Sequence, residues 1–147
     1  MEEFTQCEIL LVEDNPLDAE LVMSGFDRNK WGCEIAWVKD GEEALDYLFC
    51  RGTYAGRAET APVLMLLDLT MPKVSGIDVL REVKADERTR RMPVVVMTSS
   101  NEDSDVTRAY DLGANSYVVK PFDFADLADV LNSASHYWLS VNRRTPT

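Results

Sequence analysis

Residues 63–72 read VLMLLDLTMP, in which five consecutive apolar residues end at Asp68. A strand that is apolar at every position is typical of the centre of a parallel sheet, because helices then bury both of its faces. Similar strand patterns alternate with helical patterns throughout the 147 residues. A chain of this length has room for one domain with a sizeable core. The sequence therefore predicts a single α/β domain over residues 1–147, built from five strand–helix units.

The expected elements follow from apolar runs and from residues that begin helices. Asn15, Asp40 and Asp123 are suited to cap three of the helices. Strands are expected at 8–12, 34–38, 63–67, 93–97 and 116–119. The first helix is expected to bury a stripe of Leu17, Leu21 and Phe26. The polar stretch 51–62 is longer than most connections in such domains, which predicts either a mobile surface loop or a recognition element.

Polar residues follow four of the expected strands at the point where each strand ends. Glu13 and Asp14 come after the first strand, Asp68 after the third, Thr98 after the fourth and Lys120 after the fifth. In an open parallel sheet, ligands bind outside the carboxyl ends of the strands, where loops from different strands converge. We therefore expect these five side chains to meet in one cleft.

The residue types in this group point to phosphoryl transfer. Carboxylates crowded at Glu13, Asp14 and Asp68 repel one another, and a divalent cation with oxygen ligands relieves that repulsion. No His or Cys lies near these positions to indicate zinc, so we expect Mg2+, with the backbone carbonyl of Thr70 as a further ligand. The Asp68 carboxylate can attack phosphorus as a nucleophile. Lys120 and the Thr98 hydroxyl can then stabilise charge on the phosphoryl oxygens.

Each of these residues alone has an ordinary explanation, such as a solvated turn, a helix cap or a surface charge. The residues fit other classes of protein less well than they fit phosphoryl transfer to Asp68. A haloacid-dehalogenase-type phosphatase needs a second Asp two positions after the nucleophile, where this chain has Thr70. Glu13 and Asp14 would repel the phosphate of a flavin, and no GxxxxGK run indicates a P-loop.

The ordered motifs resemble the receiver domain of two-component response regulators over nearly the whole chain. The matching segments are Val12-Glu13-Asp14-Asn15, Leu67-Asp68-Leu69-Thr70-Met71-Pro72 with Gly76, Met97-Thr98-Ser99, and the run from Gly113 to Phe122. The resemblance implies a flavodoxin-like doubly wound sheet of order 2-1-3-4-5. It also implies that Asp68 is the phosphoacceptor and that the partner is a sensor histidine kinase. By the same resemblance, the Lys120–Pro121 bond would be cis.

Within that family the chain is similar to the small phytochrome-associated regulators. The similarity is carried by the long connection 51–62, the run 113–117 and the aromatic pair before Leu139. It implies a phosphoacceptor signalling protein rather than an enzyme, with a phytochrome-type kinase as its donor. Thr70 stands where these regulators often carry Asn, so the lifetime of the phosphorylated state is left open. The alternatives are an interaction module that works without phosphorylation and an intermediate in a multistep phosphorelay.

Composition excludes other classes of protein. Twenty-six acidic residues against fifteen basic ones give a net charge of −11, which opposes binding to a nucleic-acid backbone. No signal peptide precedes the first strand and no apolar run approaches membrane-spanning length, so we expect a cytoplasmic protein without a membrane partner. The odd cysteine count, without a CxxC pair, favours free thiols at Cys7, Cys33 and Cys50.

Two groups of aromatic residues bear on output. Tyr117 is either a packed edge residue or, as the resemblance implies, a switch ring that moves inward with Thr98. Tyr137, Trp138 and Val141 lie in an extended last helix and tail at 137–147, and we expect no output domain. Trp and Tyr commonly anchor interfaces, so we expect a homodimer on the face of the helix at 103–112, the strand at 116–119 and the last helix. The alternative is that the aromatic residues fold back on the domain's own core.

Overall fold

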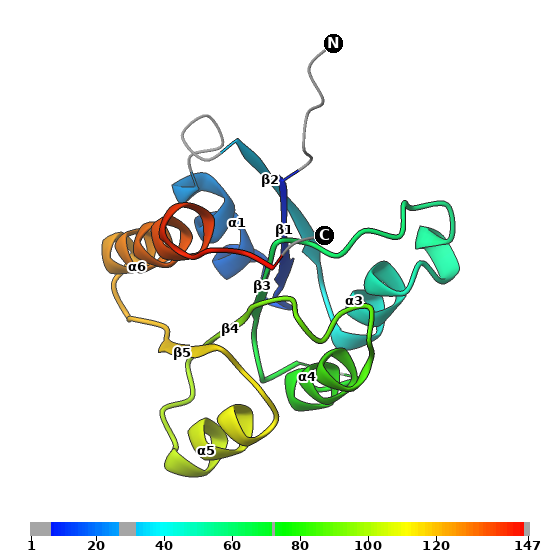
Figure 1. The fold of residues 1–147 in the computed structure, drawn as a ribbon. Helices are drawn as coiled ribbons and strands as arrows, with labels where there is room; N and C mark the ends of the chain where they lie inside the picture. The colour runs from blue at the N-terminus through cyan, green and yellow to red at the C-terminus, as the bar shows by residue number, and fades with distance from the viewer. Residues whose placement is uncertain (1–6, 27–31, 72, 146–147) are drawn as a thin grey trace.

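Five parallel strands form the centre of the structure, a computed structural model that describes residues 7–26, 32–71 and 73–145 (Figure 1). The strand order is β2-β1-β3-β4-β5, as expected. The strands are β1 (Cys7–Val12), β2 (Cys33–Val38), β3 (Leu64–Leu67), β4 (Val94–Thr98) and β5 (Ser116–Val119). Every residue of β3 is buried, as the unbroken apolar run at this position predicted.

Helices cover both faces of the sheet (Figure 1). They are α1 (Pro16–Gly25), α3 (Gly41–Leu48), α4 (Gly76–Ala85), α5 (Asp103–Asp111) and α6 (Phe124–His136), which continues as a π-helical turn (Tyr137–Val141). Asn15, Asp40 and Asp123 cap α1, α3 and α6 through their side chains, as expected.

Alternate residues of the strands divide the core into two apolar clusters. Leu10 and Met65 face the cluster formed with α3, α4 and α5, whereas Ile9 and Leu64 face the cluster formed with α1 and α6. This alternation follows from the two-residue period of a strand. The two clusters are therefore separate, with the sheet between them.

The expected stripe of α1 is wrong at Leu17, which is 70% exposed. The helix instead buries Ala19 and Val22, with Phe26 just beyond its end. Residues two apart on a helix do not share a face, so burial of Ala19 turns Leu17 toward solvent.

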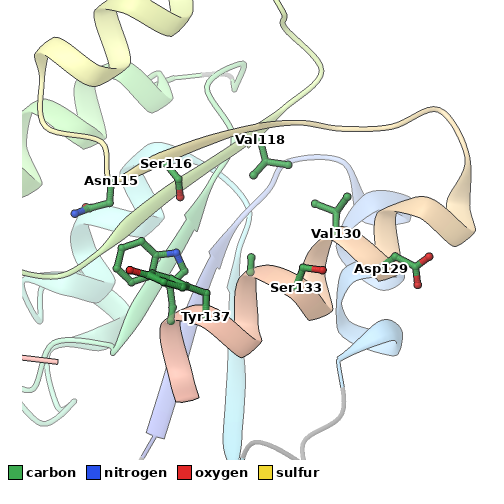
Figure 2. Close-up of a pocket in the computed structure, with 9 residues that line it drawn as sticks. Asn115, Ser116, Val118, Asp129, Val130, Ser133 and Tyr137 are labelled. Carbon is green, nitrogen blue, oxygen red and sulfur yellow. The ribbon is translucent and has the colours of Figure 1, made fainter. Parts of the chain in front are cut away.

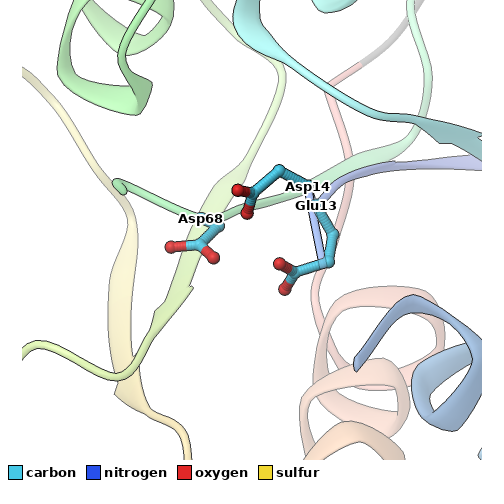
Figure 3. A group of neighbouring side chains, drawn as sticks. All are labelled: Glu13, Asp14 and Asp68. Carbon is cyan, nitrogen blue, oxygen red and sulfur yellow. The ribbon is translucent and has the colours of Figure 1, made fainter. Parts of the chain in front are cut away.

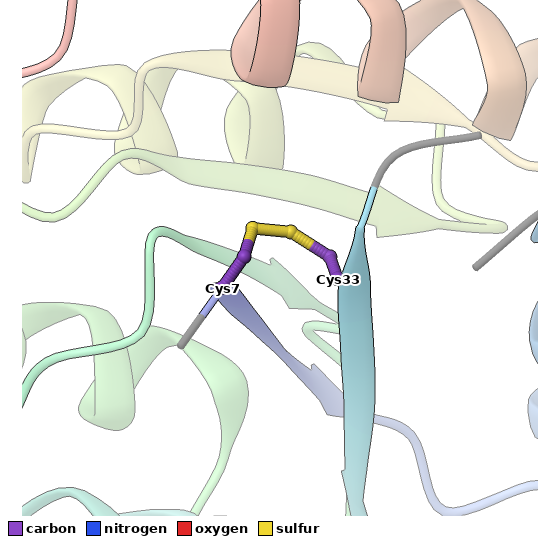
Figure 4. Close-up of a disulfide and its surroundings, with 2 residues drawn as sticks. All are labelled: Cys7 and Cys33. Atoms are coloured by element: carbon purple, nitrogen blue, oxygen red, sulfur yellow. A yellow bond between two sulfur atoms is a disulfide. The ribbon is translucent and has the colours of Figure 1, made fainter. Parts of the chain in front are cut away.

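The expectation of three free thiols is also wrong. Cys7 and Cys33 lie opposite each other in the parallel β1–β2 register and form a disulfide, with their Cα atoms 4.5 Å apart (Figure 4). That spacing lies within the range that a disulfide can bridge. Their separation of 26 residues along the chain gave no hint of the pairing, which the sheet alone creates. Cys50 is free, as expected.

The long connection between α3 and β3 packs on α3 and carries a short 3-10 helix (Gly52–Tyr54). The Tyr54 hydroxyl donates to Glu43 at 2.8 Å, and the Arg57 Nε–H donates to the Tyr47 carbonyl at 2.8 Å. The Arg57 guanidinium also lies over the Tyr47 ring, 4.1 Å from its centroid. These contacts fix the connection against the helix that precedes it.

Gly76, the first residue of α4, packs against the backbone of Asp68 and Leu69. A Cβ atom at this position would lie 2.2 Å from the Asp68 carbonyl oxygen and 2.5 Å from the Leu69 Cα. We expect Gly76→Ala to lower the free energy of unfolding by about 2 kcal/mol or more, because backbone must move to make room. Urea denaturation measures this loss. The control is Gly56→Ala, where an added Cβ meets nothing within 4 Å. Equal stability losses in the two variants would contradict the prediction.

Candidate functional site

Backbone hydrogen bonds carry the sheet pattern one residue past the end of three strands and place the site residues. The Glu13 N–H donates to the Val38 carbonyl at 3.1 Å, and the Asp68 N–H donates to the Val12 carbonyl at 3.1 Å. The Lys120 N–H donates to the Thr98 carbonyl at 2.8 Å. β1, β3 and β5 therefore place Glu13, Asp68 and Lys120 at the same edge of the sheet. Thr98, the last residue of β4, lies beside Lys120 there, so the four strand ends meet as the sequence predicted.

Three carboxylates meet at this edge (Figure 3). Oxygen atoms of Glu13, Asp14 and Asp68 all lie within 4.8 Å of one another. Glu13 is 2% exposed and Asp68 6%, whereas Asp14 is exposed. Burial raises the pKa of Glu13 to about 7, against the hydrogen bond from Lys120, and the nearby Asp68 charge adds to the rise. This oxygen-only set of ligands fits a hard divalent cation such as Mg2+.

The Lys120 ammonium lies among carboxylates and is 10% exposed. Its Nζ donates to Glu13, to Asp18 at 3.0 Å and to Asp68 at 3.2 Å. Burial alone would lower the pKa of Lys120, but the hydrogen bond to Glu13 and the charges of Asp68 and Glu13 raise it. The lysine is therefore held as a cation. Sequence reasoning missed Asp18, which reads as an ordinary acidic residue in the first turn of α1.

Both oxygens of the Asp68 carboxylate have partners. Oδ2 accepts from Lys120, and Oδ1 accepts from the Thr70 backbone N–H at 3.1 Å and from the Thr70 hydroxyl at 3.2 Å. The exposed Thr70 side chain thus holds the nucleophile of the predicted reaction. The role of its carbonyl oxygen as a metal ligand stays a prediction.

Thr98 and Tyr117 meet at a residue that sequence reasoning did not single out. Thr98 is fully buried, and its Oγ1 accepts from the Ser100 N–H at 3.5 Å. The half-buried Tyr117 donates its hydroxyl to the Ser100 carbonyl at 2.9 Å. The Ser100 hydroxyl in turn donates to Asp105 in the first turn of α5, at 2.6 Å. Thr98 is therefore linked to Tyr117 and α5 through Ser100.

A second unexpected contact supports Glu13 from behind. The Trp37 indole N–H donates to the Glu13 carbonyl at 2.8 Å. Trp37 belongs to the edge strand β2, where an aromatic residue is ordinary, so nothing in the sequence distinguished it.

The expectation of a cis bond at Lys120–Pro121 is wrong, because the described residues contain no cis peptide bond. The trans form is favoured by about 0.5–1 kcal/mol at a bond before proline. In the trans form Lys120 already keeps its backbone bond to Thr98 and its side-chain contacts with the carboxylates.

The predicted interface residues lie away from the acidic cluster, in the last turns of the C-terminal helix. Tyr137 and Val141 are exposed, and Trp138 is half-buried. The Tyr137 and Trp138 rings touch edge to face, with centroids 5.0 Å apart. None of the three is brought to the carboxylates.

A model of the response regulator receiver domain matches residues 9–132, which include all four strand ends of the site. The chain belongs to this family. The receiver therefore has the flavodoxin-like fold that its motifs implied. No helix in the described part of the receiver is long and apolar enough to cross a membrane.

Two relatives of the receiver match over most of their own length. The probable methanogenesis regulatory protein FilR2 of Methanothrix harundinacea is 45% identical over 135 residues, which cover 92% of this chain and 85% of FilR2. Response regulator Rcp1 of Synechocystis is 36% identical over 133 residues, which cover 90% of this chain and 89% of Rcp1.

Solved structures of similar receivers bear on both phosphate and metal. The phosphorylated cyanobacterial phytochrome response regulator RcpA matches with a TM-score of 0.90 and 35% identity, covering 97% of this chain and 100% of RcpA. The Mn2+-bound form of Rcp1 matches with a TM-score of 0.88 and 34% identity, covering 95% of this chain and 99% of Rcp1. Regulators of this kind thus include one that is phosphorylated and one that holds a divalent cation.

The raised pKa of Glu13 predicts how stability changes with pH in the absence of metal. The pKa is about 7 in the folded chain against 4.5 as its ordinary value. Between these values the folded state binds more protons than the unfolded state, so stability falls as pH rises. We expect EDTA-treated protein to lose about 2–3 kcal/mol of unfolding free energy between about pH 5 and pH 7.5. Mg2+ should restore stability near neutral pH by mass action.

Thermal melts at both pH values, in EDTA and in Mg2+, measure this effect. Glu13→Gln is the control, because a side chain that does not titrate should flatten the pH dependence in EDTA. An EDTA-treated wild type whose melting temperature does not fall over this range would contradict the prediction, and a fall of equal size in Glu13→Gln would show that another group is responsible.

Proposed function

We propose that the receiver accepts a phosphoryl group on Asp68 from a sensor histidine kinase, in a reaction that requires Mg2+. The observation that carries the proposal is the surroundings of the Asp68 carboxylate. One oxygen is held by Lys120, the other by Thr70, and Glu13 and Asp14 lie beside it. The same arrangement argues against an interaction module that works without phosphorylation, which would not need it.

The proposed reaction forms a bond between an Asp68 oxygen and phosphorus while the donor's bond to phosphorus breaks, and the donor leaves with the electron pair. A bound Mg2+, held by Glu13, Asp14 and Asp68, would supply positive charge for the phosphoryl oxygens. Lys120 contributes a second positive charge through its contact with the Asp68 Oδ2 atom. Thr98 would offer its hydroxyl to a further oxygen once it turns from Ser100.

Asp68→Asn tests the acceptor directly. We expect the variant to keep its fold and to lose all incorporation of acid- and base-labile phosphate from a small-molecule phosphodonor in Mg2+. Phosphate labelling and intact mass measure the stoichiometry. Asp126→Asn, the same change at an exposed carboxylate in α6, should label like the wild type. Stoichiometric labelling of Asp68→Asn would refute the assignment.

A phytochrome-type kinase is the proposed donor. The support is the similarity to RcpA, whose name makes it a phytochrome response regulator. FilR2, which is named for methanogenesis regulation and not for a phytochrome, is 45% identical to the receiver. A kinase of another sensor class is therefore the competing candidate. Phosphotransfer from a phosphorylated phytochrome kinase should be faster than from a kinase of another sensor class, and the reverse order would favour the competitor. Onward transfer to a histidine-containing protein would instead indicate a phosphorelay. The cytoplasmic location expected from the sequence remains a prediction.

We also propose that two copies of the receiver associate on the face of α5, β5 and α6. Tyr137 and Val141 expose 48% and 59% of their surface there. Beside them a groove of about 610 Å3 opens between β5 and α6 (Figure 2). Trp138 lines the groove but also packs against the apolar cluster of α1 and α6, so it serves the chain's own core as well. Tyr117 would bias this surface when Thr98 moves toward the phosphoryl group.

Light scattering tests the dimer at tens of micromolar, with and without phosphodonor. Val141→Glu should shift the receiver to monomer, because a charge would be buried at the interface. Leu17→Glu, an equally drastic change at the exposed start of α1, should leave the dimer intact. A wild type that is monomeric in both states contradicts the proposal.

A further inference from the structure

The three N–H groups of the Lys120 ammonium are all in use. An ammonium carries three donors and no acceptor. In the receiver these donors meet Glu13, Asp18 and Asp68, one carboxylate for each. A phosphoryl group on Asp68 brings oxygens that also need the Lys120 charge. One of the three present contacts must therefore open when the phosphoryl group arrives.

The three carboxylates differ in how readily they can give Lys120 up. The side chains of Glu13 and Asp68 are 2% and 7% exposed, whereas that of Asp18 is 30% exposed. A buried carboxylate that loses its cation is left without water to replace it. Asp18 lies at the solvent side, where water can take the place of the ammonium. Asp18 is therefore the contact that opens most easily.

Resting on the proposed function, we infer that Asp18 is a positioning residue that holds Lys120 in the unphosphorylated receiver and releases it when Asp68 is phosphorylated. The carboxylate does not touch the reacting atoms. It acts through the lysine, from the first turn of α1, by stabilising the state from which phosphorylation starts. Asp18 therefore slows phosphorylation. It does not affect the stability of the phosphorylated state, in which the other groups of the site hold the phosphoryl group.

This role separates the two halves of the reaction. When Asp68 attacks an acyl phosphate such as acetyl phosphate, the Asp68 oxygen–phosphorus bond forms and acetate leaves with the electron pair. This step begins with Lys120 on Asp18. In hydrolysis, water attacks phosphorus, and the Asp68 carboxylate and inorganic phosphate are released. This step begins with Lys120 already on the phosphoryl group, so Asp18 has no contact left to lose.

The experiment compares wild type with Asp18→Ala at saturating Mg2+, with acetyl phosphate as donor. We expect the rate constant of phosphorylation to rise about three- to fivefold in Asp18→Ala, as suits loss of a partly exposed ion pair. The rate constant of aspartyl phosphate hydrolysis should stay within about twofold of wild type. Asp18→Glu, which keeps the carboxylate, should return the phosphorylation rate toward wild type. A variant that is merely less well folded would not change one rate and spare the other.

Glu20→Gln is the matched control, because it removes the same charge from the exposed side of the same helix without any contact to Lys120 among the described interactions. It separates the contact from the general effect of negative charge on an anionic donor. We expect its phosphorylation rate to match wild type. An equal rise in Glu20→Gln and Asp18→Ala would overturn the role of Asp18.

A second measurement tests the contact without any phosphate. Lys120 should react faster with acetic anhydride in unphosphorylated Asp18→Ala than in wild type, as followed by peptide mass spectrometry. Unchanged reactivity would overturn the inference. A wild type that takes up no phosphate would overturn the proposed function and this inference together. A wild type that labels normally, with Asp18→Ala labelling at the same rate, would overturn the role of Asp18 alone.

Discussion

The charge of Lys120 makes this arrangement of acids possible. Glu13 and Asp68 are almost fully buried, and a buried carboxylate without a partner is penalised by several kcal/mol. The ammonium donates a hydrogen bond to each of them, so both buried carboxylates have a cationic partner. Lys120 offsets only part of the cost of burying the Glu13 charge, as the raised pKa of Glu13 indicates. A site that holds more negative than positive charge is also one that gains from a divalent cation.

The sheet brings these charges together through strand order and register. Val12 of β1 lies opposite Leu67 of β3, so the next residues, Glu13 and Asp68, emerge side by side. On the other side, Thr98 of β4 lies opposite Val119 of β5, which places Lys120 one residue beyond. The carboxyl ends of three strands thus supply the charges: Glu13 and Asp14 follow β1, Asp68 follows β3 and Lys120 follows β5. A shift in register by one residue would turn each side chain to the other face.

Much of this could be predicted from sequence because the signals were local. Strands fully buried in a parallel sheet appear as unbroken apolar runs, and the residue after each run identified Asp68, Thr98 and Lys120. The errors and omissions were tertiary. Asp18 reads as an ordinary acid in the first turn of a helix, and only the position of Lys120, 102 residues later, gives it a partner.

Other features depended on the sheet or on competing local preferences. The Cys7–Cys33 bridge exists because β1 and β2 are neighbours, a fact that spacing along the chain cannot show. Leu17 fits an apolar stripe by type, yet the helix turned its other side to the core.

The separation of the core into two clusters has a last consequence for signalling. Tyr117 packs with one cluster and Trp138 with the other, so in the proposed switch a movement of Tyr117 would have to cross β5 to reach Trp138. That edge strand contains no fully buried residue, which makes it the most easily displaced layer between input and output.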